Sequence, residues 1–175
     1  MDVSAFLAKW RVPIGWICGV IALYFSAPTP WFYLIGLLLA AFGEGVRMWA
    51  AGHLEKNRAV TTTGPYGWSR NPLYFGSLWV GLGFGVASGN LVFVVAVLVL
   101  FCVIYVPVMR RESVFLSTVF PSTYDVYSNQ VPFFWPKSPT ITTGHFSWEL
   151  ALSNRELLTV SGWLGYAFLL GFKLL

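Results

Sequence analysis

The sequence predicts an all-α integral membrane protein, on three observations. Hydrophobic residues make up 57% of the 175 positions, charged residues only 10%, and apolar segments recur along the chain. A soluble core of this size would carry more charge. The apolar segments are residues 12–27, 31–51, 73–87, 91–109 and 157–175. Several fall short of the roughly 20 residues that cross a bilayer, so we expect about five transmembrane helices, some tilted, in one membrane-embedded domain over residues 1–175.

Composition also excludes some classes of function. The basic residues behind the net charge of +4 stand singly between apolar segments, so we predict no nucleic-acid partner. Cys18 and Cys102 each lie within an apolar run, as packing residues do. The two histidines form no cluster with metal-ligand spacing, so no metal site is expected. The glycine-rich run at residues 81–85 lies inside an apolar segment, where glycines favour close helix contact over cofactor binding.

The distribution of positive charge predicts the orientation. The connections at residues 27–30 and 88–90 carry no charge, whereas all of the 11 Lys and Arg residues except Arg47 and Lys173 lie toward the other side. By the positive-inside rule, the N-terminus is cytoplasmic and the C-terminus is outside. The polar segments 52–72 and 110–156 then meet on the cytoplasmic face. No small-residue cleavage pattern follows the first apolar run, so we expect a retained span there.

The first polar segment contains a turn followed by a helix start. Residues 61–76 read TTTGPYGWSRNPLYFG. Gly64 is free to take a positive φ and Pro65 fixes the next φ, which predicts a turn. Pro72 suits the first turn of a new helix, where its missing N–H costs nothing. Arg70, Asn71 and Tyr74 are then presented at the mouth of a membrane helix, where they can bind a charged small molecule.

The second polar segment begins with Arg110, Arg111 and Glu112. Apolar residues at helical spacing over 113–128 predict an interfacial amphipathic helix, ended by prolines from residue 132 onward. Basic residues at a cytoplasmic helix end are ordinary anchors, but Glu112 is less ordinary there. Its carboxylate can accept hydrogen bonds from an amine or from ribose hydroxyls.

Glu44 and Arg47 lie three residues apart inside the second apolar segment and share a helix face. Because a charge at mid-bilayer costs roughly 2.5–3.5 kcal/mol on insertion scales, the pair should neutralise itself or face a cavity. An internal salt bridge and a direct role in ligand binding are both open at this point.

The two polar segments resemble the isoprenylcysteine carboxyl methyltransferase and phospholipid methyltransferase superfamily of membrane enzymes. Its first block is Gly-Pro-Tyr, three residues, then Arg-His-Pro-x-Tyr-x-Gly, and this chain has Gly64-Pro65-Tyr66 followed by Arg70-Asn71-Pro72-Leu73-Tyr74-Phe75-Gly76. The matching residues of the second block are Glu112, Phe120, Tyr124, Tyr127, Val131, Pro132 and Pro136. Residues 47–57 also look like bacterial members, and the resemblance covers roughly residues 43–136.

The resemblance implies that S-adenosylmethionine binds in a cytoplasmic-side pocket and that a lipid or lipidated substrate enters from the bilayer. Carried over by position, the residues that line the pocket are Tyr66, Asn71, Pro72, Leu73, Tyr74 and Glu112, with backbone from the stretch Arg58 to Thr61. A sulfonium can lie against aromatic rings, and Arg70 can pair with the methionyl carboxylate. A bacterial inner membrane is the expected location.

Two departures from the family pattern bear on the reaction. Asn71 replaces the family histidine, which removes a titratable group. Val108 stands where isoprenylcysteine enzymes have an arginine taken to bind the substrate carboxylate, so Arg111, and next Arg47, are the candidates to replace it. The alternatives left open are a phospholipid amine as acceptor, an NADPH-dependent isoprenoid or sterol reductase, and a non-catalytic membrane protein.

Overall fold

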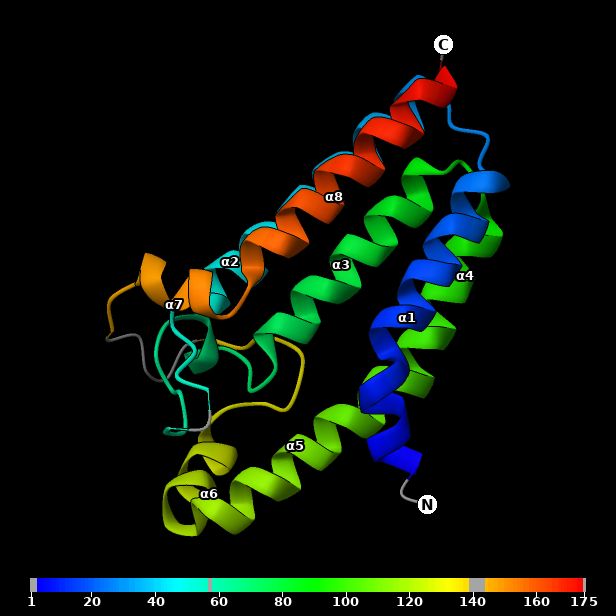
Figure 1. Cartoon of the computed structure of the whole chain (residues 1–175). Coiled ribbons are helices and arrows are strands. Elements are labelled where there is room, and N and C mark those ends of the chain that lie inside the picture. Colours follow the sequence, from blue (N-terminus) through cyan, green and yellow to red (C-terminus); the bar gives the residue numbers. More distant parts are fainter. Residues whose placement is uncertain (1–2, 57, 139–143, 175) are drawn as a thin grey trace.

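The computed structural model describes residues 3–56, 58–138 and 144–174, and these residues form helices and turns without a strand (Figure 1). The elements, in chain order, are α1 (Val3–Tyr24), α2 (Pro30–Ala51), the 3-10 turn η1 (Gly64–Gly67), α3 (Pro72–Ala87), α4 (Leu91–Leu100), the π-helical turn η2 (Phe101–Tyr105), α5 (Val106–Val119), α6 (Pro121–Gln130), α7 (Trp148–Ser153), α8 (Glu156–Gly171) and the 3-10 turn η3 (Phe172–Leu174).

Within the part of the chain that the structure describes, three helical stretches are long and apolar enough to cross a membrane: Pro30–Ala51, Leu91–Val119 and Glu156–Leu174. Two shorter apolar helices, Pro13–Tyr24 and Pro72–Ala87, correspond to the first and third predicted segments. Large apolar side chains point outward on these helices; Leu38 is 64% exposed and Leu91 75% exposed. Such a surface suits lipid contact and not water, so the predicted all-α membrane fold is confirmed.

Helices α2 and α3 form the most closely packed pair, because glycines let their backbones meet. A Cβ added to Gly36 would lie 2.4 Å from the carbonyl oxygen of Gly83, and one added to Gly43 would lie 2.6 Å from that of Gly76. The glycines of residues 81–85 therefore serve helix packing, as predicted. This contact fixes the start of α3 relative to the end of α2.

The fourth span differs from the prediction. It was expected to end at residue 109, but the helix continues to Val119 through the π-helical turn η2. Pro107 follows that turn and has no N–H for the helical ladder, which is a known cause of bending. Figure 1 shows α5 leaving the line of α4 and running to the lower left, where α6 follows. The bend brings the second polar segment to the first.

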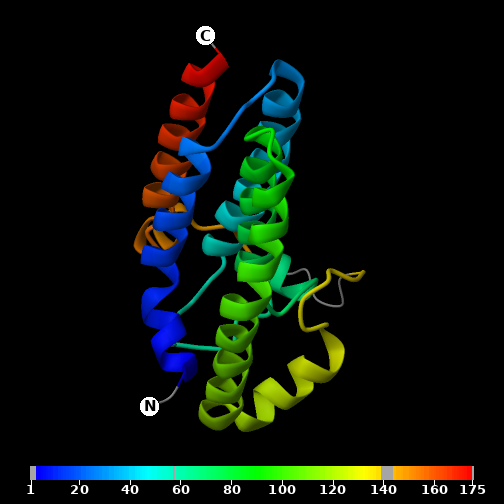
Figure 2. The ribbon, with the colours of Figure 1, turned by 90° about the vertical axis from the view of Figure 1, so that its right-hand side faces the viewer.

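The amphipathic helix expected over 113–128 is divided in two. Phe120 leaves the helical conformation (φ −129°, ψ 58°), and Pro121 begins α6. Figure 2 shows α5 running to one end of the bundle and α6 turning back from it. Proline is favoured at a first helical position and excluded from an interior, so Pro121 places this break. Helix α6 ends at Gln130, before Pro132, as expected.

The described parts of both long polar segments lie at one end of the bundle, and the short connections and the C-terminus lie at the other (Figure 1). At the latter end, Lys173 Nζ donates to the carbonyl oxygens of Leu23 at 2.9 Å and Ser26 at 2.8 Å, which ties the end of the chain to α1. The arrangement agrees with the predicted clustering of polar segments. Which side of the membrane they face stays a prediction.

Candidate functional site

The turn η1 begins the candidate site. Gly64 has a φ of +56°, as the sequence predicted, and Pro65 follows it. A network of hydrogen bonds then joins the residues after this turn to the segment after α6. The bonds run from Arg70 N to Pro132 O (2.9 Å), Ser69 Oγ to Phe134 O (2.8 Å), Asn71 Nδ2 to Phe133 O (2.8 Å) and Lys137 N to Trp68 O (3.1 Å). The two polar segments therefore form one unit.

Tyr66 lies at the centre of this unit and is only 7% exposed. Its carbonyl oxygen accepts a hydrogen bond of 2.8 Å from the Tyr127 hydroxyl. Burial, and next the charge of Glu112, raise the pKa of the Tyr66 phenol well above its ordinary value. The phenol is therefore neutral at physiological pH, where it can donate a hydrogen bond.

Arg70 and Asn71 have different surroundings at the start of α3. The Arg70 guanidinium donates to the Tyr124 hydroxyl at 3.3 Å and lies 5.5 Å from the centre of the Phe133 ring. Its Nε is buried and has no hydrogen-bond partner among the described residues. Asn71 is 6% exposed, and its amide nitrogen donates to the Phe133 carbonyl. Pro72 is the first residue of α3, as predicted.

Tyr74 and Glu112 lie in contact although one is at the start of α3 and the other in α5. The Tyr74 hydroxyl donates to Oε2 of Glu112 at 3.1 Å. The Tyr74 ring lies edge to face with Tyr105 at a centroid distance of 5.8 Å, and Tyr105 stacks on Phe101 at 5.3 Å. Glu112 itself is exposed. The geometry presents a carboxylate beside aromatic faces, which together favour a cationic or hydroxyl-bearing ligand.

The neighbours of Glu112 in sequence point away from the core. Arg110 and Arg111 are both exposed, whereas Val108 is 6% exposed and packs inside. The position expected to bind a substrate carboxylate therefore presents a buried apolar side chain. Exposed guanidinium groups lie one and two residues from Glu112, on the same helix α5.

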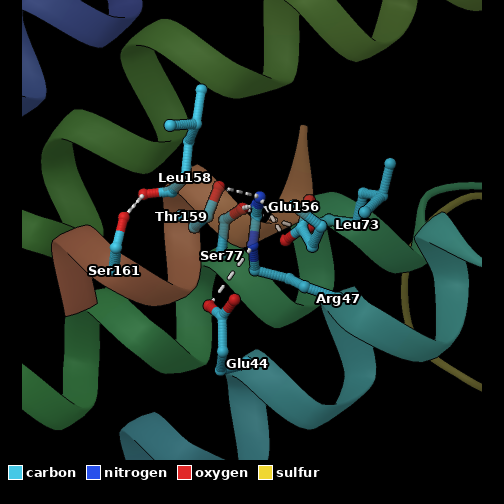
Figure 3. A network of polar contacts seen from close by, with 8 residues as sticks. All are labelled: Glu44, Arg47, Leu73, Ser77, Glu156, Leu158, Thr159 and Ser161. Carbon is cyan, nitrogen blue, oxygen red and sulfur yellow. Dashed lines mark hydrogen bonds and ion pairs between the residues drawn. The ribbon is translucent and has the colours of Figure 1, made fainter. Parts of the chain in front are cut away.

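Arg47 is at a polar junction of α2, α3 and α8 (Figure 3). Its Nη2 lies 2.7 Å from Oε1 of Glu156 and donates to Thr159 at 3.3 Å, and its Nη1 donates to Ser77. Its Nε lies 3.6 Å from Oε2 of Glu44. The predicted Glu44–Arg47 pair is thus present, but the closer partner is Glu156. Nη1 and Nη2 contact side chains of this chain, and Nε faces Glu44 without a hydrogen bond, which favours the salt-bridge interpretation over a direct role in ligand binding.

Arg58 and Thr61, the candidates from the stretch before the turn η1, contact residues near the end of α2 and α7. Arg58 is exposed and lines a cavity of about 250 Å³ together with Glu149 of α7 and Asn154, the residue after α7. The Thr61 hydroxyl accepts a hydrogen bond of 3.1 Å from the Glu55 backbone N–H. None of the residues that line this cavity belongs to the Tyr74–Glu112 contact. The structure thus places Arg58 beside α7 and Thr61 beside Glu55.

Several residues of the site were not identified from the sequence. Glu156 pairs with Arg47, and His53 packs against η1, but each stands alone in the sequence near the end of an apolar segment. The Tyr105 ring packs against Tyr74, and the rings of Tyr74, Tyr105 and Phe101 are here called the aromatic wall. Only the spacing of seven residues between Tyr105 and Glu112 could have indicated that Tyr105 lies at the site. Among the described residues no group of three His, Cys, Asp or Glu side chains could bind a metal ion.

Comparison with known proteins gives a family match. The model of the family described as phospholipid methyltransferase matches residues 31–123, just over half of the 175 residues. The chain is 27% identical over 155 residues to the cobalt-zinc-cadmium resistance protein CzcN of Cupriavidus metallidurans, which covers 85% of this chain and 71% of that protein. No solved structure matches.

Two further relatives are matched over about half of their own length. The nickel-cobalt-cadmium resistance protein NccN of Alcaligenes xylosoxydans xylosoxydans is 30% identical over 106 residues, covering 59% of this chain and 48% of that protein. The protein-S-isoprenylcysteine O-methyltransferase of Saccharomyces cerevisiae is 28% identical over 119 residues, covering 61% of this chain and 50% of that protein. The family match spans both sides of the Tyr74–Glu112 contact.

Proposed function

Because the chain belongs to the phospholipid methyltransferase family, we propose that it is an S-adenosylmethionine-dependent membrane methyltransferase acting on an apolar or lipid-like acceptor. The observation that carries this proposal is the hydrogen bond between Tyr74 and Glu112, since it joins the two family blocks at one point. The exposed apolar surface of the helices supports a substrate that arrives from the bilayer.

The donor set suits the cofactor. Glu112 supplies a carboxylate for ribose hydroxyls or an amine, and Arg70 has a buried Nε that no described residue uses. Tyr74 and Tyr105 supply aromatic faces for a positive charge. The side chains that we assign to this pocket are those of Tyr66, Arg70, Asn71, Pro72, Leu73, Tyr74 and Glu112. From the stretch Arg58 to Thr61 we assign only backbone atoms to it.

When bound, S-adenosylmethionine supplies a methyl group that its sulfonium already activates. The chain's own task is therefore to align the two substrates and to exclude water. The bonds from Arg70 and Asn71 to the segment after α6 fix the pocket walls, and the aromatic wall around Tyr74 keeps water out. A carboxylate acceptor needs no general base, whereas an ammonium acceptor has to lose its proton before transfer.

The acceptor class has a second candidate, the amine of a phospholipid. Two observations favour it: Val108 is buried where an arginine would bind a carboxylate, and Arg47 already pairs with Glu156. An isoprenylcysteine-type carboxylate then depends on Arg111. The metal-resistance names of two relatives describe those proteins and add no substrate here.

Isothermal titration of the purified chain in detergent tests the cofactor. We expect S-adenosylmethionine and its demethylated product to bind at one site, and NADPH not to bind. Binding of NADPH alone would replace the proposal with a reductase. Binding of neither ligand, by a chain shown to be folded, would favour a non-catalytic membrane protein.

A further inference from the structure

His53 lies just beyond the end of α2 and is only 7% exposed. Its Nδ1 lies 3.2 Å from the hydroxyl of Thr63, one residue before the turn η1. Its ring also meets Trp49 of α2 at a centroid distance of 6.5 Å and Phe146 at 6.4 Å. A titratable ring is thus enclosed by aromatic groups and by the segment that carries the first family block.

Gly64 fits against this ring only because it has no side chain. A Cβ there would lie 2.6 Å from His53 Cδ2 and 2.7 Å from Nε2. The φ of +56° also requires glycine at this position. The backbone of the turn at Gly64, two residues before Tyr66, therefore packs directly against the imidazole.

A second segment encloses His53 from the other side. Residues 144–148, here called the strap, run over the end of α2, and Ser147 N donates to the Gly52 carbonyl at 2.9 Å. A Cβ on Gly52 would lie 2.2 Å from the Phe146 ring, so the strap contacts the backbone beside His53 directly. The strap also touches the turn segment, since a Cβ on Gly144 would lie 2.5 Å from Thr63 Cβ.

These surroundings disfavour a charged imidazole. Burial, and next the charge of His145 in the strap, lower the pKa of His53 from the model-compound value of 6.5. Four uncharged residues pack against the ring: Trp49 of α2, Thr63 and Gly64 at the turn, and Phe146 of the strap. Among the described residues, the titratable group whose charge acts on His53 is His145. The folded chain thus takes up this proton less readily than the unfolded chain, so stability falls as pH falls below 6.5.

We propose that His53 is a positioning residue that keeps the Gly64–Gly67 turn in place only while it is neutral, so that acid loosens the turn and weakens cofactor binding. The last step rests on the proposed function. The loosening of the turn in acid does not depend on which ligand the turn supports.

The pH dependence of S-adenosylmethionine affinity tests the proposal, because the chain has just two histidines. Histidine is the side chain whose ordinary pKa lies between about 5 and 8. For the unmodified chain we expect affinity to fall as pH is lowered from neutrality, by at most about tenfold per pH unit for one proton. His53→Asn retains a partner for Thr63 and has no charge to gain, so its profile should be flat. His53→Phe, which keeps an uncharged ring against Gly64, is the second such variant.

His145→Asn is the matched control. Because the His145 charge lowers the pKa of His53, its removal should preserve the acid-induced fall and move it to higher pH. An acid-induced fall that persists unchanged in both His53 variants would overturn the proposal. A flat profile for the unmodified chain would overturn it as well.

Hydrogen–deuterium exchange separates this proposal from the proposed function. The amides of Tyr66, Trp68 and Ser69 donate to the carbonyls of Thr63 and Pro65 within the turn. Comparing the unmodified chain with His53→Asn at each pH removes the intrinsic pH effect on exchange. We expect protection to fall in acid only when His53 is present. If that occurs while S-adenosylmethionine fails to bind at any pH, the positioning role stands and the proposed function fails. Equal protection of these amides in the unmodified chain and in His53→Asn at acid pH would contradict the positioning role.

Discussion

The hydroxyl of Tyr74 donates a hydrogen bond of 3.1 Å to Oε2 of Glu112, although 38 residues separate them in the chain. One residue belongs to the start of α3 and the other to α5, beyond the bend at the π-helical turn. This contact brings a carboxylate to the mouth of a membrane helix, beside the Tyr105 ring. We propose this contact as the place where the cofactor binds.

Replacing Glu112 with Gln should weaken S-adenosylmethionine binding roughly 10- to 150-fold, the effect of losing a charge-assisted hydrogen bond of about 1.5–3 kcal/mol. The change is nearly isosteric and the side chain is exposed, so the melting temperature without ligand should hardly change. Titration calorimetry and thermal unfolding measure the two effects. Asp125→Asn, on the exposed face of α6, is the matched control and should change neither. An unchanged dissociation constant would remove Glu112 from the site.

Replacing Arg47 with Met should destabilise the fold by about 3–5 kcal/mol, because it leaves the Glu156 carboxylate buried without its partner. The double change Arg47→Met with Glu156→Gln should recover part of that loss. Glu44→Gln should cost less than Glu156→Gln, since Glu44 lies 3.6 Å from the guanidinium and Glu156 only 2.7 Å. Thermal unfolding of the four variants checks the order. A fully stable Arg47→Met chain with impaired acceptor use would instead support the acceptor-binding role.

The sequence was informative where one residue type determines local geometry. Gly64 indicated the positive φ, and Pro72 and the apolar segments indicated the helix starts and spans. The Tyr74–Glu112 contact was accessible only through the family resemblance, because no local pattern relates residues so far apart. The continuation of the fourth helix to Val119 was missed because Arg110, Arg111 and Glu112 end the apolar run, and hydropathy reports the run and not the helix. The pairing of Arg47 with Glu156 depends on the tertiary packing of α8.

We predict that Arg111 determines whether an anionic acceptor is used. If the acceptor is a carboxylate, Arg111→Met should raise its KM or lower kcat while cofactor affinity is retained, since an exposed guanidinium next to Glu112 is the remaining candidate. If the acceptor is a phospholipid amine, the change should matter little. Arg110→Met, one residue away and equally exposed, is the control. Turnover of acetylated farnesylcysteine and of phosphatidylethanolamine gives the readout. Efficient use of the farnesylcysteine without any effect of Arg111→Met would contradict this role.

The orientation in the membrane is testable by cysteine labelling in a chain whose Cys18 and Cys102 are replaced by Ser. Ser138 is exposed in the polar segment after α6, and Thr29 is exposed in the uncharged connection before α2. By the positive-inside rule, Ser138→Cys should react only after the membrane is opened, and Thr29→Cys should react from outside. The reverse pattern would show that the polar segments face outward.

Transfer of a labelled methyl group to membrane lipid tests the central claim most directly. Membranes containing the chain are incubated with methyl-labelled S-adenosylmethionine, and the lipids are then extracted and separated. We expect label in an apolar product with the unmodified chain, and a large loss of label with Glu112→Gln at a cofactor concentration below the variant's dissociation constant. No labelled lipid above membranes that lack the chain, with folded protein and bound cofactor demonstrated, would contradict a lipid methyltransferase.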